Sequence, residues 1–313
     1  MSGCVSWQAR QLVTPERIAW ADAEGLDALL DSAEARGVLA RGSVSVGAPS
    51  VAYRYLIFRP STPEYDFEDE SMDDEYSFSF DYRLGDPLDC NRPRTLLFLH
   101  GYGANAMQAF MWAPPLVERC WTVIAPDLRA HGGSGGDKVS FGVRERADLI
   151  DFLDALRGSE IQAGPVSVLG LSYGGTLALA LNASGYPFQK TVAVAPFERG
   201  DRAARRAIER FRGNMSSGRI NAILKRAAEI ADIDWDDTAI DGRTTGDVHV
   251  VVSAGDRINP ADAGCSLAAR LEAACHRLDD PRWTHETLMI PSPDVLAVVL
   301  DVLTSDQPEN SGP

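Results

Sequence analysis

Short apolar runs alternate with amphipathic segments along most of the chain. Consecutive Val, Leu, Ile and Phe residues predict strands buried on both faces, at residues 95–100, 120–125, 166–169, 191–195 and 248–253. Apolar residues spaced three or four positions apart predict helices between them: one after residue 105 that ends at about residue 118, and others at 141–156, 176–181, 260–274 and 294–303. Strands that alternate with helices form a mostly parallel sheet with helices on both faces, so the pattern predicts an α/β fold.

The first eighty residues follow a different pattern. Thr14, Pro15 and Gly37 carry the signals that begin and end a helix, so we expect a helix over residues 14–36 and a helical extension over residues 1–40. Residues 43–46 and 51–58 predict an antiparallel strand pair, and residues 76–83 predict an edge strand. The segment 64–75 holds eight acidic residues and no basic one, which indicates a solvated loop. Calcium binding is the alternative, although the spacing of its acids is not that of a calcium loop.

A second interruption falls at about residues 197–245, inside the main domain that we place at 41–305. Residues 202–211 and 219–230 of this insertion are helical in pattern. Nine basic residues against three acidic ones lie between Glu198 and Arg226. They form either a solvated helical face or a surface that attracts an anionic acyl substrate. The polar tail at 306–313 is expected to be frayed.

The stretch from Pro165 to Ala180 indicates chemistry. Its apolar strand leads into Gly170-Leu171-Ser172-Tyr173-Gly174, and Ala and Leu then predict a helix. A strand, a sharp turn and a helix are the context in which a G-x-S-x-G motif presents a nucleophilic serine. Gly170 and Gly174 lack a Cβ, so the strand and helix backbones can pass closely. Ser172 is therefore the candidate nucleophile.

A serine hydroxyl needs a base, and an imidazole base needs a carboxylate that fixes its tautomer. His285 follows a short predicted strand near Arg277–Trp283 and precedes the last helix, so we prefer it over His276, which we expect at the end of a helix. Asp256 follows the strand at 248–253 in a turn, and it is preferred as the acid. Glu198 and Asp201 are the alternative acids.

An oxyanion that forms during acyl transfer needs two hydrogen-bond donors. The backbone N–H of Tyr173 is free to serve, because donors in the first turn of a helix have no partner inside it. The N–H of Tyr102 is the natural second donor. His100, Gly101 and Gly103 are expected to shape the turn that carries Tyr102.

Composition limits the class of partner and the compartment. The chain has 313 residues, a net charge of -15 and an apolar fraction of 45%, which suits a folded domain but not a nucleic-acid or anionic-membrane binder. Its five scattered cysteines contain no C-x-x-C pair, so we expect reduced thiols and a cytoplasmic location. No secretory signal and no apolar stretch of membrane-spanning length is found.

Together these pieces resemble the α/β-hydrolase-fold serine hydrolases, of the group with a small helical cap. The matching segments cover about residues 41–305 and are His100-Gly101-Tyr102-Gly103, 126–132, 170–175, Gly255-Asp256, and His285 followed by Pro293. The resemblance implies Ser172, Asp256 and His285 as a catalytic triad, Tyr102 and Tyr173 as oxyanion donors, and a cap at 197–245. The chain departs from the family at Ala130 and at Trp283-Thr284, where glycine is usual.

The resemblance also implies an activity. It points to an enzyme that needs no metal or cofactor and cleaves a carboxylic ester or thioester through an acyl-Ser172 intermediate. Its partner would be a small-molecule acyl substrate. The same residues also suit acyl transfer, amide cleavage or C–C hydrolysis, and a non-catalytic ligand-binding relative is a further alternative.

Overall fold

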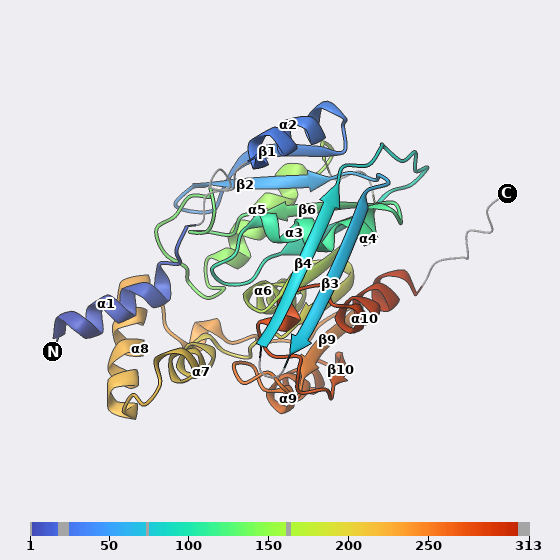
Figure 1. The fold of residues 1–313 in the computed structure, drawn as a ribbon. Coiled ribbons are helices and arrows are strands. Elements are labelled where there is room, and N and C mark those ends of the chain that lie inside the picture. The colour runs from blue at the N-terminus through green and yellow to red at the C-terminus, as the bar shows by residue number, and fades with distance from the viewer. Residues whose placement is uncertain (1, 18–24, 73–74, 161–163, 306–313) are drawn as a thin grey trace.

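A single large sheet organises the molecule (Figure 1). The computed structural model describes residues 2–17, 25–72, 75–160 and 164–305. Its eight strands lie in the order β1-β2-β6-β5-β7-β8-β9-β10. All neighbours from β6 to β10 are parallel, whereas β1, β2 and β6 pair antiparallel. The strands are β1 (Leu39–Val46), β2 (Val51–Phe58), β5 (Arg94–Leu99), β6 (Trp121–Pro126), β7 (Val166–Leu171), β8 (Phe188–Val194), β9 (Asp247–Ser253) and β10 (Ala274–Leu278).

Helices cover both faces of this sheet, as the alternating pattern predicts. They are α2 (Leu26–Ala35), α3 (Ala109–Trp112), α4 (Pro114–Val117), α5 (Glu145–Leu156), α6 (Tyr173–Ala183), α9 (Ala261–Arg270) and α10 (Pro293–Thr304), with 3₁₀ turns η2 (Ala106–Gln108), η3 (Asp236–Thr238) and η4 (Thr287–Met289). Within the described ranges, none of the helices has the length and apolar character needed to cross a bilayer.

The central strands are buried on both faces because successive side chains point to opposite sides of a sheet. In β5, Leu97 and Leu99 contribute to the cluster that also holds residues of α5 and α6. Leu96 and Phe98 join the opposite cluster, which includes residues of α2, α3 and α10. This arrangement explains why these strands read as continuous apolar runs rather than as an alternating pattern.

The insertion after β8 contains two long helices, α7 (Gly200–Arg212) and α8 (Ser217–Ala231). Helix α1 (Ser2–Val13) lies against α8 (Figure 1), and its Ala9 and Val13 are buried in one cluster with Ile208 and Ile223. The prediction of one helix over residues 14–36 is wrong: residues 18–24 lie outside the described part, and two separate helices flank them. Residues of the predicted frayed tail, 306–313, also lie outside the described part.

The acidic segment is a strand rather than the predicted solvated loop. Strands β3 (Glu64–Met72) and β4 (Glu75–Arg83) pair antiparallel in a separate two-stranded sheet, so β4 is not an edge of the main sheet. The stacked rings of Phe67 and Phe78 and the contact of Tyr82 with Phe110 explain how this hairpin holds together and to the body. A period-two aromatic pattern among the acids was the sequence signal for it.

The prediction of five reduced cysteines is also wrong. Disulfides join Cys90 to Cys120 and Cys265 to Cys275, and Cys4 is the free cysteine. The first ties the segment before β5 to the start of β6, and the second ties α9 to β10. Because disulfides persist mainly in oxidising compartments, the cytoplasmic location inferred from reduced thiols loses this support.

The Cys90–Cys120 bond should contribute measurably to stability. It joins residues 30 positions apart, and the chain-entropy model assigns about 3–4 kcal/mol to a loop of this size. The double variant Cys90→Ser, Cys120→Ser is expected to lower the free energy of unfolding in urea by that amount. Cys4→Ser, at an exposed position, is the control and should leave it unchanged within about 0.5 kcal/mol. Equal stability of the double variant and the control would contradict a role for this bond.

Candidate active site

Ser172 stands in a strained turn between β7 and α6. Its φ of 49° lies in the left-handed region, which a side chain adopts only when the surrounding structure enforces it. Two glycines make the turn possible. A Cβ on Gly170 would lie 2.1 Å from the carbonyl oxygen of Gly174, and one on Gly174 would lie 2.0 Å from the carbonyl oxygen of Leu99. The predicted strand, turn and helix are therefore present, with the predicted need for glycine at both positions.

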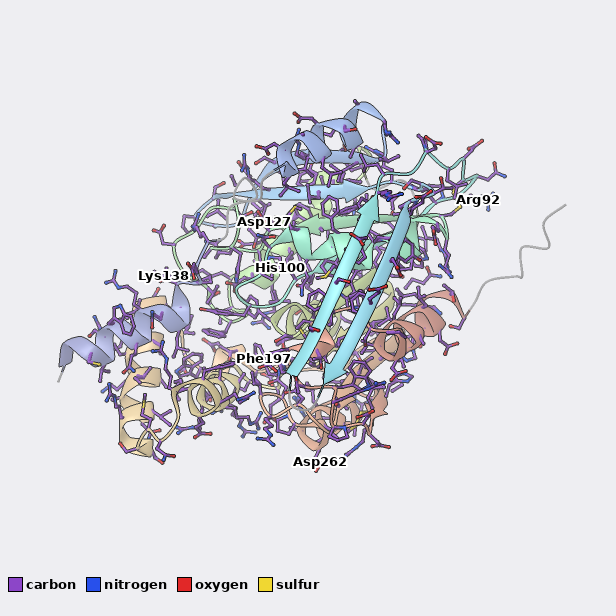
Figure 2. The ribbon with its side chains drawn as sticks, in the orientation of Figure 1. Arg92, His100, Asp127, Lys138, Phe197 and Asp262 are labelled. Atoms are coloured by element: carbon purple, nitrogen blue, oxygen red, sulfur yellow. A yellow bond between two sulfur atoms is a disulfide. The ribbon has the colours of Figure 1, made fainter. Side chains whose placement is uncertain are left out.

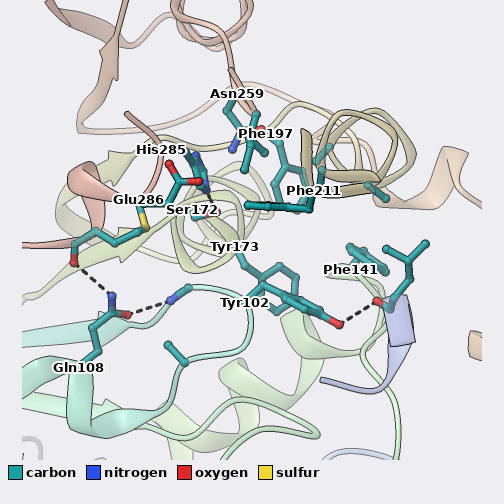
Figure 3. A pocket seen from close by; sticks show the side chains of 18 residues that line it. Tyr102, Gln108, Phe141, Ser172, Tyr173, Phe197, Phe211, Asn259, His285 and Glu286 are labelled. Atoms are coloured by element: carbon teal, nitrogen blue, oxygen red, sulfur yellow. Dashed lines mark hydrogen bonds between the residues drawn. The ribbon is translucent and has the colours of Figure 1, made fainter. Parts of the chain in front are cut away.

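The structure brings Ser172, His285 and Asp256 together although they lie far apart in the sequence. The Oγ of Ser172 lies 2.9 Å from Nε2 of His285, and Nδ1 of His285 lies 2.7 Å from Oδ2 of Asp256 (Figure 3 shows the first two residues). A carboxylate only accepts hydrogen bonds, so Nδ1 carries the proton and Nε2 accepts from the serine hydroxyl. His285 precedes η4 in a turn and does not continue a strand.

Asp256 is held by its other oxygen as well. Its Oδ1 accepts hydrogen bonds from the backbone N–H groups of Ile258, at 2.8 Å, and Asn259, at 2.7 Å. The side-chain amide of Asn259 donates in turn to the carbonyl oxygen of Ala195, at the end of β8. Asp256 is buried, and its carboxylate cannot rotate without losing these partners.

The alternative residues lie elsewhere. His276 is in strand β10 and not at a helix end, and its Nε2 lies 2.7 Å from Nδ1 of His249. Glu198 pairs with Arg202, and Asp201 pairs with Arg199, so both acids are engaged in the cap.

The backbone amides of Tyr102 and Tyr173 are available as donors. Within the described part of the chain, no group accepts a hydrogen bond from either N–H. A Cβ on Gly101 would lie 3.9 Å from Cβ of Ser172, so the turn that carries Tyr102 passes close to the serine. Gly103 adopts a φ of 76°, which glycine reaches without strain.

Gln108 joins this turn to the segment that follows His285. Its Oε1 accepts from the N–H of Gly101, at 3.1 Å, and its Nε2 donates to the carbonyl oxygen of Met289, at 3.2 Å (Figure 3). The sequence analysis missed Gln108 because a lone glutamine near a helix start carries no distinctive pattern.

His100 and His131 are buried and hydrogen-bonded to the backbone of nearby turns. In His100, Nδ1 donates to the carbonyl oxygen of Gly101, and Nε2 accepts from the N–H of Leu128. His100, marked in Figure 2, thereby connects the end of β5 to the residues that follow β6. Burial and the neighbouring His131 lower the pKa of His100 well below its ordinary value. Ala130 has a φ of 63°, in the left-handed region that favours glycine, which is the residue that the resemblance implies at this position.

Stability should fall in acid through His131. Burial lowers its pKa from 6.5 to about 4, so the unfolded chain binds this proton first as the pH falls. Its contribution is complete above pH 6.5 and is lost progressively down to about pH 4, by roughly 3 kcal/mol. His131→Asn keeps a donor for the carbonyl oxygen of Arg129 but does not titrate. The free energy of unfolding, measured in urea at several pH values, should change less between pH 6.5 and 4 in the variant than in the wild type. An equal change in both proteins would contradict the expectation.

A cavity of about 430 Å³ opens beside Ser172 and His285 (Figure 3). Its other lining residues are mainly apolar and come from both ends and the middle of the chain: Leu12, Gly101, Tyr102, Ala104, Gln108, Phe141, Tyr173, Phe197, Ala203, Ala204, Ala207, Phe211, Ile258, Asn259, Glu286 and Met289. Among these described residues no Arg or Lys is found, although α7 is rich in arginine. The alanines of α7 face the cavity, while cap arginines such as Arg199 and Arg202 form ion pairs with acids.

Leu12 is the lining residue that sequence reasoning missed most completely. The hydroxyl of Tyr102 donates to the carbonyl oxygens of Gln11 and Leu12, each at 3.0 Å, which fixes the end of α1 beside the cavity. No local pattern in residues 2–13 indicates this long-range contact.

The described residues offer no group of three or more His, Cys, Asp or Glu side chains placed to hold a metal ion.

Known structures share the fold. An esterase from Pyrococcus furiosus matches with a TM-score of 0.63 and 15% identity, over 94% of this chain and 97% of that one. An alpha-beta hydrolase from Vibrio vulnificus matches with a TM-score of 0.64 and 15% identity, over 97% and 94%. A serine hydrolase without a lid from Xanthomonas campestris gives a TM-score of 0.54 and 16% identity, over 87% and 97%.

Sequence comparison gives a shorter and a longer match. The uncharacterised protein YqkD of Bacillus subtilis (strain 168) is 30% identical over 87 residues, which span 28% of this chain and 28% of YqkD. The model of the alpha/beta hydrolase family matches residues 96–299, from β5 to α10, and this range includes Ser172, Asp256 and His285. The chain belongs to the alpha/beta hydrolase family.

Proposed function

We propose that the protein is a serine hydrolase that cleaves a carboxylic ester, or a thioester, through an acyl-Ser172 intermediate. Membership of the alpha/beta hydrolase family supports a hydrolase. The observation that carries the finer proposal is the pair of short contacts from Ser172 to His285 and from His285 to Asp256, beside an apolar cavity. A nucleophile, a base and an orienting acid at hydrogen-bond distance are the arrangement that acyl transfer requires.

In the first half-reaction, the Oγ of Ser172 attacks the ester carbonyl carbon while Nε2 of His285 takes the hydroxyl proton. The oxyanion accepts hydrogen bonds from the N–H groups of Tyr102 and Tyr173. The tetrahedral intermediate collapses as His285 returns the proton to the leaving alcohol or thiol. Asp256 keeps Nδ1 protonated and stabilises the imidazolium ion.

In the second half-reaction, water attacks the acyl carbon and His285 takes its proton. Collapse of the second tetrahedral intermediate releases the carboxylic acid, and the proton returns to Ser172. The lining supports a neutral, apolar acyl group rather than the anionic one that the basic cap suggested, because the arginines of the cap do not line the cavity.

A fluorophosphonate probe and p-nitrophenyl butyrate test the proposal together. The wild type should be labelled at Ser172 and should release p-nitrophenol, and Ser172→Ala should lose both. If the probe fails to label the protein even at high concentration, and no ester is hydrolysed, the result would favour the non-catalytic binder. Labelling without hydrolysis, followed by turnover in the presence of an acyl acceptor or an amide, would identify an acyltransferase or an amidase.

A further inference from the structure

A second apolar cavity adjoins the first. It measures about 250 Å³ and shares Leu12, Tyr102, Ala207 and Phe211 with the cavity beside Ser172. Beyond these shared residues it continues between α1, α7 and α8, along Gln8, Gln11, Ile208, Arg212, Met215 and Ile223. The four shared residues place the two cavities next to each other, and we call the two together the path, whose first section lies at the serine.

The packing of α1 on the cap creates this second section. The polar side chains that line it have hydrogen-bond partners: Oε1 of Gln11 accepts from Arg212, at 2.6 Å, and Oε1 of Gln8 accepts from Arg219, outside the cavity, at 3.0 Å. The carbonyl oxygens at the end of α1 accept from the hydroxyl of Tyr102. What remains to face the interior is mainly aliphatic and aromatic surface, which suits hydrocarbon.

We propose that this path binds the linear alkyl chain of a long-chain ester, with its distal methylene groups between α1 and α7. The proposal rests on the ester hydrolysis proposed above and adds the substrate class. The occupant follows from continuity with the cavity beside Ser172, because a chain whose carbonyl lies at the serine reaches the second section only through the first. Leu12, Ala207 and Phe211 then determine how long a chain is accepted.

Chain length should affect the reaction strongly. Each methylene group that leaves water for an apolar site contributes about a fourfold gain in affinity. For p-nitrophenyl esters from acetate to dodecanoate, kcat/KM of the wild type is expected to keep rising beyond the lengths that the first cavity holds. If four methylene groups occupy the second section, excluding them should lower kcat/KM by about two hundredfold.

Ala207→Trp tests this at the junction of the two sections. Ala207 is only partly buried, so the larger ring has room to be accommodated by the fold. The variant is expected to lower the ratio of dodecanoate to acetate kcat/KM at least tenfold. Glu209→Trp, which adds the same side chain at an exposed position of the same helix, is the matched control and should keep the wild-type ratio.

A second series identifies which side of the ester carries the chain. Acetate esters of alcohols from ethanol to dodecanol place the chain on the alcohol side, whereas the p-nitrophenyl series places it on the acyl side. If Ala207→Trp loses the preference for long chains in the p-nitrophenyl series, the path binds the acyl chain. If it loses that preference in the acetate series, the path binds the alcohol chain. Unchanged ratios in both series would overturn the proposal, even if the enzyme hydrolyses short esters well.

Binding without turnover separates this proposal from the proposed function. Ser172→Ala should bind dodecanoate in calorimetry, and adding Ala207→Trp should weaken that binding at least tenfold. If dodecanoate binds and the wild type hydrolyses no ester, the proposed hydrolase is contradicted and the chain-binding path is kept. If the wild type hydrolyses esters and Ala207→Trp does not weaken dodecanoate binding, the chain-binding path is contradicted and the hydrolase is kept. If Ala207→Trp does not fold, Met215→Trp, which lines the second section alone and is partly buried, is used in its place.

Discussion

Alanine in place of His285 is expected to lower kcat for p-nitrophenyl butyrate by roughly 10⁴- to 10⁶-fold. The reason is the 2.9 Å contact between Nε2 and the Oγ of Ser172, which positions this imidazole to take the serine proton. Without the base, the hydroxyl attacks as a weak nucleophile, and only substrate binding and the two backbone donors remain to accelerate the reaction. Labelling of Ser172 by a fluorophosphonate should slow to a similar extent.

His276→Ala is the matched control for this prediction. His276 was the alternative base, but it lies in β10 against His249 rather than beside the serine. Its removal should leave kcat within about twofold and act only on stability. A loss smaller than tenfold in His285→Ala, or a larger loss in His276→Ala, would show that the base is wrongly assigned. Melting temperatures of both variants exclude unfolding as the cause.

Much of the site could be predicted from sequence because its constraints are local. At positions 170 and 174 a Cβ would clash with neighbouring backbone atoms, so the turn at Ser172 requires glycine at both. Both glycines belong to the five-residue G-x-S-x-G motif, so this requirement can be recognised in the sequence. The proximity of Asp256 and His285 to Ser172 could be predicted because parallel strands bring their carboxyl ends to one edge, so residues that follow strands converge there. The predicted oxyanion turn also follows a strand, β5.

What the sequence did not indicate depends on contacts between distant segments. Residues 2–13 carry an ordinary amphipathic pattern, and nothing in it specifies that Leu12 meets the cavity or that α1 packs on α8. The partners of Cys90 and Cys265 depend on which turns and strands meet in space, so scattered spacing was mistaken for reduced thiols. In residues 64–72, the many acidic residues led to the prediction of a loop, whereas the segment forms strand β3, which pairs along its whole length with β4.

Asp256→Asn is expected to lower kcat by about 10³- to 10⁴-fold while the melting temperature changes little. The two backbone N–H groups of Ile258 and Asn259 require an acceptor, so the oxygen of the new amide must take the place of Oδ1. The amide NH₂ then faces Nδ1 of His285, where Oδ2 lies in the wild type, 2.7 Å away. Two donors cannot share that contact, so the imidazole must move its proton to Nε2. In that tautomer, Nε2 faces the serine hydroxyl as a donor and cannot take its proton.

Asp262→Asn gives the control for the same change of charge and size, because Asp262 is exposed and pairs with Arg277. It should keep kcat within about twofold, as the loss of a surface ion pair has little effect. In Asp256→Asn the loss should appear in kcat and not in KM, because the apolar lining that binds substrate is untouched. An unchanged kcat would mean that the tautomer of His285 is not set by residue 256. A collapse of the melting temperature would instead mean that Asp256 acts chiefly by holding the turn at Ile258 and Asn259.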